Sequence, residues 1–143
     1  MAEFYFGERS KLRIATCHED LATVLHAAMA TQILDFTVLC GHRATAEQQA
    51  LYAQGRTRPG RIVTNADGVS SRSKHNEYAA RAVDVAPWPV DWDDTPRFHR
   101  LAGVILAIAA AEGVAIRWGG DWDRDGDTTD HRLIDLPHFE LIG

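Results

Sequence analysis

The sequence predicts an α+β fold, with a small antiparallel sheet and helices packed against it. Short apolar, β-branched segments alternate with longer segments of helical periodicity, and the connections are too irregular for repeated βαβ units. The 143 residues are a usual length for one domain, and no repeat or low-complexity linker divides them. We therefore expect a single domain over residues 1–143.

The expected elements follow from periodicity and from residues typical of helix ends. The expected helices cover residues 17–31, 45–55 and 95–113, and the expected strands cover 33–40, 82–86, 114–118 and 137–142. Thr16 with Glu19, and Thr45 with Gln48, have the spacing of capping boxes at the first two helix starts. Gly113 is expected to end the third helix.

Composition excludes several classes of protein. The net charge of -5 argues against a nucleic-acid-binding protein, which would normally have a basic face. The N-terminal residues contain no apolar run long enough for a signal peptide, and no apolar stretch elsewhere is long enough to span a membrane. We expect synthesis in the cytoplasm and no membrane insertion. Cys17 and Cys40 form no CxxC pair and are expected to be packing residues.

Asp84 stands inside a short apolar strand, 82–86, and His75 precedes it at the end of a long loop. Alternation along the strand places Asp84 on the face opposite its two valines. A carboxylate in such a strand costs free energy unless it is paired or bound to a metal. Asp84 is therefore either a metal ligand, together with His75, or a buried carboxylate satisfied by backbone donors or by Arg81.

A second polar cluster lies in residues 135–140, DLPHFE. His138 and Glu140 share one face of the expected strand, and Asp135 lies just before them across a turn. Two histidines and one carboxylate leave the fourth tetrahedral position of zinc open, as in catalytic zinc sites. A nearby carboxylate can take a proton from water and pass it to the leaving amine. Asp135 is the candidate general base.

Several motifs occur in an order that resembles a known family. They are residues 41–43, 45–48, 51–57, 62–66, 73–75, 82–84, 118–122 and 135–140. Together they span nearly the whole chain and resemble the zinc peptidases of bacterial cell walls that include D-alanyl-D-alanine carboxypeptidases and dipeptidases. Within that group the chain looks most like the phage endolysin L-alanyl-D-glutamate endopeptidases.

The resemblance implies a hedgehog-like α+β fold and zinc held by His75, Asp84 and His138, with Asp135 as the base. It implies cleavage of the L-Ala–D-Glu bond of the peptidoglycan stem peptide during phage lysis. The enzyme would act as a monomer and reach the wall after release from the host cytoplasm. A zinc D,D- or L,D-carboxypeptidase and a non-catalytic wall-binding module are the alternatives on the same scaffold.

The resemblance also assigns supporting roles. Arg43 would bind the substrate carbonyl or the developing oxyanion, a task suited to a permanently charged guanidinium with several donors. Ser73 would support its loop and contact the substrate. Gln48 would do likewise, unless it only caps a helix.

The segment between His75 and Asp84 departs from the family pattern. It contains eight residues, NEYAARAV, and is longer than usual in these endolysins. We therefore expect either a bulge in this segment or a shift in strand pairing. Glu77 is the alternative ligand if Asp84 is displaced.

An acidic loop near the C-terminus has the DxDxDG opening of a calcium-binding EF-hand loop. The candidate calcium ligands are Asp121, Asp123, Asp125, Asp127 and Asp130. Gly126 permits the sharp turn, but Arg132 stands where an EF-hand has its bidentate glutamate. The loop is either a calcium site or a solvated acidic turn.

Overall fold

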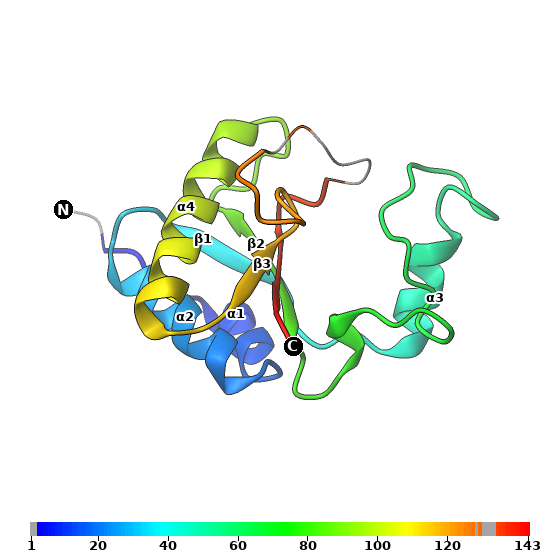
Figure 1. Ribbon diagram of the computed structural model, residues 1–143, viewed down its shortest axis with the longest axis horizontal. Helices are drawn as coiled ribbons and strands as arrows, with labels where there is room; N and C mark the ends of the chain where they lie inside the picture. The colour runs from blue at the N-terminus through cyan, green and yellow to red at the C-terminus, as the bar shows by residue number, and fades with distance from the viewer. Residues whose placement is uncertain (1–2, 128, 130–133) are drawn as a thin grey trace.

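The computed structural model describes residues 3–127, 129 and 134–143 (Figure 1). In chain order the elements are α1 (Glu8–Ile14), α2 (Glu19–Ala30), β1 (Phe36–Cys40), α3 (Thr45–Ala53), the short 3-10 helix η1 (Lys74–Asn76), β2 (Ala82–Pro87), α4 (Thr95–Glu112), β3 (Ile116–Trp118) and β4 (His138–Leu141). The strands form one antiparallel sheet in the order β1-β2-β4-β3. The predicted α+β class is confirmed.

One face of the sheet carries the hydrophobic core. Alternation along β2 turns Val83 and Val85 to this face, and both are completely buried. Opposite them lie α2 and α4, whose buried residues recur at helical spacing. Figure 1 shows α1, α2 and α4 together on this side of the sheet.

The other face of the sheet looks toward α3 and the loop that follows it, which Figure 1 shows set apart from the remaining helices. The only buried residue of α3 is Gln48, a polar residue. This part of the chain therefore has little apolar core of its own. The space between it and the sheet is where the polar residues singled out from the sequence collect.

The expected start of the first long helix is wrong by two residues. α2 begins at Glu19, and its N-cap is His18, whose Nδ1 accepts a hydrogen bond from the Asp20 amide at 3.0 Å. The Thr16 hydroxyl instead donates to the Arg13 carbonyl at 2.7 Å, at the end of α1. Helix α1 was not predicted from the sequence; it has seven residues, of which Ser10 and Ile14 are buried.

The second capping box is also wrong. α3 begins at Thr45, and Glu47 rather than Gln48 accepts a hydrogen bond from the backbone amide of the N-cap residue, Ala44, at 3.3 Å. Gln48 turns inward instead. The predicted end of α4 is confirmed, because Gly113 has the left-handed φ of 72° that suits a residue without a Cβ.

None of the helices among the described residues is long and apolar enough to cross a lipid bilayer.

Candidate active site

The register of β2 and β4 brings Asp84 and His138 together. The two residues are directly paired across the strands, so their side chains leave the same face of the sheet. This is the face opposite the core valines. Residues 54 positions apart in the sequence thus become neighbours through strand pairing alone.

His75 reaches the same point from η1. The Ser73 hydroxyl accepts a hydrogen bond from the His75 amide at 3.2 Å and fixes the start of this short turn. His75 Nε2 lies 3.2 Å from Asp84 Oδ1, and His138 Nδ1 lies 3.3 Å from the same oxygen. Ligands about 2.0–2.1 Å from a tetrahedral zinc ion stand roughly 3.3 Å apart, so both distances suit a shared metal ion.

The remaining ring nitrogens are held by outer partners. His75 Nδ1 donates to the Gly41 carbonyl at 2.7 Å, and His138 Nε2 donates to Glu140 Oε1 at 2.8 Å. These bonds leave His75 Nε2 and His138 Nδ1 as the unprotonated nitrogens in the neutral rings, and both face Asp84. Histidines that bind metals almost always have such partners. The donor set therefore fits a zinc ion.

The electrostatics of the three side chains also suit a cation. Burial alone disfavours charged imidazoles, but the Asp84 carboxylate raises the pKa of His75 to about 10 and that of His138 to about 9. Burial of Asp84 opposes its ionisation, yet the two histidines hold the pKa of Asp84 below its usual range. The cluster thus favours positive charge beside Asp84, which either protons or a metal ion can supply.

Asp135 lies next to this cluster without belonging to a strand. Its Oδ2 is 3.9 Å from His138 Nδ1. Burial, together with the nearby Asp84 carboxylate, raises the pKa of Asp135 to about 6. A carboxylate with a pKa close to neutrality is well suited to accepting and returning a proton.

A glycine makes the position of Asp135 possible. The Asp135 amide donates to the Gly119 carbonyl at 2.9 Å, and the Gly119 amide donates to the His138 carbonyl at 2.8 Å. A Cβ at Gly119 would lie 2.1 Å from the Asp135 carbonyl oxygen. Only a residue without a side chain allows the two backbone segments to come this close.

Arg43 connects the sheet to the α3 side of the site. Its Nη2 donates to Asp84 Oδ2 at 3.2 Å, and its Nη1 donates to Gln48 Oε1 at 2.9 Å. The Gln48 amide nitrogen donates to the Ala66 carbonyl at 2.8 Å. Gln48 is completely buried and is not among the described residues that line the cavity. It is placed to orient Arg43 rather than to contact a substrate.

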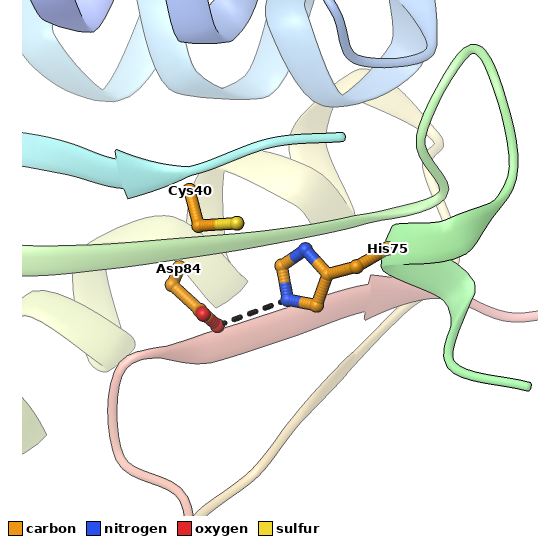
Figure 2. A group of neighbouring side chains, drawn as sticks. All are labelled: Cys40, His75 and Asp84. Atoms are coloured by element: carbon orange, nitrogen blue, oxygen red, sulfur yellow. Dashed lines mark hydrogen bonds and ion pairs between the residues drawn. The ribbon is translucent and has the colours of Figure 1, made fainter. Parts of the chain in front are cut away.

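Cys40 is a residue of this site that the sequence analysis missed. An irregularity in β1 between Val38 and Cys40 pairs Cys40, instead of Leu39, with Asp84. The bulge turns the thiol out of the core and toward His75 and Asp84, as Figure 2 shows. Cys17 is buried, as expected for a packing residue. Burial raises the pKa of its thiol to about 11.

The longer segment before Asp84 does not displace it. Residues 77–81 form a turn held against the end of α1, where the Ala80 amide donates to the Thr16 carbonyl and the Ala80 carbonyl accepts from the His18 amide. The Glu77 carboxylate lies 3.6 Å from Arg81 and is half exposed. Glu77 is therefore not the substitute ligand, and Arg81 does not neutralise Asp84.

The acidic loop brings oxygen atoms of Asp121, Asp123 and Asp125 within 4.8 Å of one another. The Asp121 carboxylate accepts hydrogen bonds from the amides of Asp125 and Gly126 at 3.3 and 2.9 Å. Asp127 accepts from Thr129 at 2.8 Å, while Asp130 and Arg132 lie outside the described residues. Calcium binding remains a prediction.

The side chains of Arg43, His75, Asp84, Asp135 and His138 line a cavity of about 720 Å³. Its walls come from the sheet, from η1, from α3 and its following loop, and from Trp122, whose ring centroid lies 5.4 Å from that of His138. Two histidines and a carboxylate at metal-binding distances in an open cavity, beside a second carboxylate, are typical of a metal-dependent hydrolase.

Comparison with known proteins agrees with this class. The sequence model described as "Phage L-alanyl-D-glutamate peptidase" matches residues 1–142. The chain belongs to this family, and the predicted peptidase class is confirmed.

Similar proteins cover most of the chain. The L-alanyl-D-glutamate peptidase of Escherichia phage T5 is 29% identical over 97% of this chain and 98% of its own length. The peptidoglycan L-alanyl-D-glutamate endopeptidase CwlK of Bacillus subtilis is 32% identical over 85% of this chain and 69% of its own. The crystal structure of the L-Ala D-Glu endopeptidase ChiX of Serratia marcescens superposes with a TM-score of 0.72, at 26% identity, over 98% of this chain and 92% of that one.

Proposed function

We propose that this chain is a zinc-dependent endopeptidase that hydrolyses the bond between L-Ala and D-Glu in the peptidoglycan stem peptide. The observation that carries the proposal is the approach of His75 Nε2 and His138 Nδ1 to one oxygen of Asp84, at 3.2 and 3.3 Å. The choice of bond is supported by three similar proteins, each of which is named as a peptidase or endopeptidase for the L-Ala–D-Glu bond.

His75, Asp84 and His138 would hold the metal. Zinc, when bound, would polarise the scissile carbonyl and make water a better nucleophile at neutral pH. The remaining groups of the site belong to the protein and handle protons and charge.

Asp135 is placed to take a proton from the attacking water and deliver it to the D-Glu nitrogen as the amide bond breaks. A carboxylate beside the attacking water can make both transfers near neutral pH. Arg43 would stabilise the negative charge that develops on the carbonyl oxygen. Its three side-chain partners, Asp84, Gln48 and Cys40, fix the orientation of the guanidinium before substrate arrives.

The test combines metal analysis with product analysis on purified peptidoglycan. We expect about one zinc per chain, and release of new L-Ala carboxyl ends and D-Glu amino ends that stops when a chelator removes the metal and resumes when zinc is restored. Digestion of a free pentapeptide, with release of its C-terminal residue only, would instead identify a carboxypeptidase. Folded protein that holds zinc and cleaves neither substrate would contradict the proposal.

A further inference from the structure

The cavity contains three cationic side chains, and they differ in their partners. Arg43 contacts Asp84 at 3.2 Å, and Lys74 contacts Glu140 at 3.5 Å. Each is therefore already paired with a carboxylate. Among the described residues, Arg72 has no carboxylate partner.

Arg72 is nevertheless held in place. Its Nη2 donates to the Asn76 carbonyl at 3.1 Å and its Nη1 to the Gly68 carbonyl at 3.4 Å. The turn that carries Gly68 is itself fixed by Asp67, whose carboxylate accepts from the amides of Val69 and Ser71 at 2.8 and 2.9 Å. A guanidinium has five N–H donors, so these contacts orient Arg72 while leaving donors for a ligand.

Arg72 lines the same cavity as the metal ligands, so its remaining N–H donors are close to the metal site. Arg72 directly precedes Ser73, which lines the cavity, and lies three residues before His75. Neutral ligands would need no cation here. The cavity is also lined by Asp135, whose carboxylate would repel an anionic ligand unless a positive charge received that ligand.

The proposed substrate is such a ligand. A glutamate joined to L-Ala through its amino group keeps two carboxyl groups, and only one of them can be linked to the next residue. The residue on the leaving side of the bond thus carries a free carboxylate. An arginine suits this group because its planar fork matches carboxylate geometry.

We propose that Arg72 is the specificity residue that binds the free carboxylate of the D-Glu on the leaving side of the cleaved bond. This inference rests on the proposed function and deepens it. It means that the enzyme distinguishes a wall peptide with a free glutamate carboxyl from one in which that carboxyl has been amidated.

The test uses two synthetic peptides, N-acetyl-L-Ala-D-Glu-L-Lys with one free glutamate carboxyl, and the same peptide with that carboxyl as a carboxamide. We expect the wild type to have the higher kcat/KM on the acid. Arg72→Gln should lower kcat/KM on the acid by about tenfold to a hundredfold, because a charge-assisted contact is lost. On the amide, kcat/KM should change by less than about twofold. Arg72→Lys should retain part of the preference.

Arg58→Gln is the matched control, since it makes the same charge change in the same loop at a residue outside the cavity lining. Arg58→Gln should leave kcat/KM on the acid, kcat/KM on the amide and the ratio of the two unchanged. The inference would be overturned if Arg72→Gln left the ratio of kcat/KM on the acid to kcat/KM on the amide unchanged. If both kcat/KM values fell equally, Arg72 would only hold its loop in place. A wild-type enzyme that cleaves neither peptide nor peptidoglycan would instead refute the proposed function, and this inference with it.

Discussion

The two walls of the cavity are built in different ways. On the sheet side, Asp84 and His138 are fixed by strand register, and the reverse face of the same strands is completely buried against α2 and α4. On the other side, α3 and residues 54–73 contribute one buried polar side chain, Gln48, and a network of hydrogen bonds to backbone carbonyls.

The difference separates metal binding from substrate positioning. Core packing resists small changes, so the two ligands on strands, Asp84 and His138, are held by the best-packed part of the molecule. A region held by hydrogen bonds opens at lower free energy cost than a packed core. We therefore expect changes on the sheet side to abolish the metal site, and changes on the α3 side to reduce activity while zinc stays bound.

The largest effect is expected from a ligand on the sheet side. His138→Ala should abolish zinc binding and lower kcat/KM by more than about a thousandfold, because two of three ligands cannot hold the ion in the required geometry. Metal analysis and peptidoglycan digestion measure both losses. His26→Ala, at an exposed histidine on the core side of the sheet, should bind zinc and digest peptidoglycan normally.

Asp135→Asn should separate catalysis from metal binding. The amide keeps the size of the side chain but cannot accept the proton, so kcat should fall by about a hundredfold to ten-thousandfold. Zinc content should stay near that of the wild type. An Asp135→Asn protein with near-normal turnover would remove Asp135 as the general base.

Gly119→Ala should displace Asp135 while leaving its carboxylate chemically unchanged. The new Cβ would meet the Asp135 carbonyl oxygen at 2.1 Å, so the backbone must shift. A misplacement of about 1 Å can cost on the order of a hundredfold in activity, and overpacking about 1–3 kcal/mol of the free energy of unfolding. Gly103→Ala, where a Cβ meets nothing within 4 Å, is the control. Equal activity of Gly119→Ala and Gly103→Ala would contradict the proposal that the close approach of Gly119 to Asp135 positions the base.

On the α3 side, Gln48→Ala should lower activity by about tenfold at constant zinc content, since Arg43 loses its orienting partner. The unpaired Ala66 carbonyl and Arg43 donor should lower the free energy of unfolding by about 1–3 kcal/mol. Gln49→Ala, at the exposed neighbour, should change neither quantity. Loss of zinc from Gln48→Ala would show that the two walls are not independent.

The smallest effect is expected at the acidic loop. If it binds calcium, calorimetry on the intact protein should detect uptake in the micromolar-to-millimolar range that is lost when Asp123 and Asp125 are both changed to Asn. Zinc content should not change in that double variant. Absence of calcium uptake by the wild type, or its persistence in the variant, would leave the loop as an acidic turn.

The faces of the strands were easier to predict than the capping of the helices, although β1 and β3 begin at Phe36 and Ile116, three and two residues later than expected. Alternation in β2 and β4 correctly separated core residues from site residues, because side chains of a strand point to opposite faces whatever the strand packs against. Capping boxes are weaker signals. The Thr16 hydroxyl accepts a hydrogen bond from the His42 amide at 2.9 Å, and Gln48 accepts one from the Arg43 side chain at 2.9 Å; a capping pattern reveals neither partner. The short helix α1 lacks a long apolar stripe and was missed for that reason.

The sequence by itself determined the chemical groups of the site: two histidines, two aspartates and an arginine in motifs of one peptidase family. Tertiary structure decided how they meet. The direct pairing of Asp84 with His138 and the bulge that presents Cys40 depend on strand register, and the turn that absorbs the extra residues before Asp84 depends on backbone hydrogen bonds near the end of α1. Register is set by contacts between segments far apart in the chain, and therefore cannot be read from the spacing within any one of them.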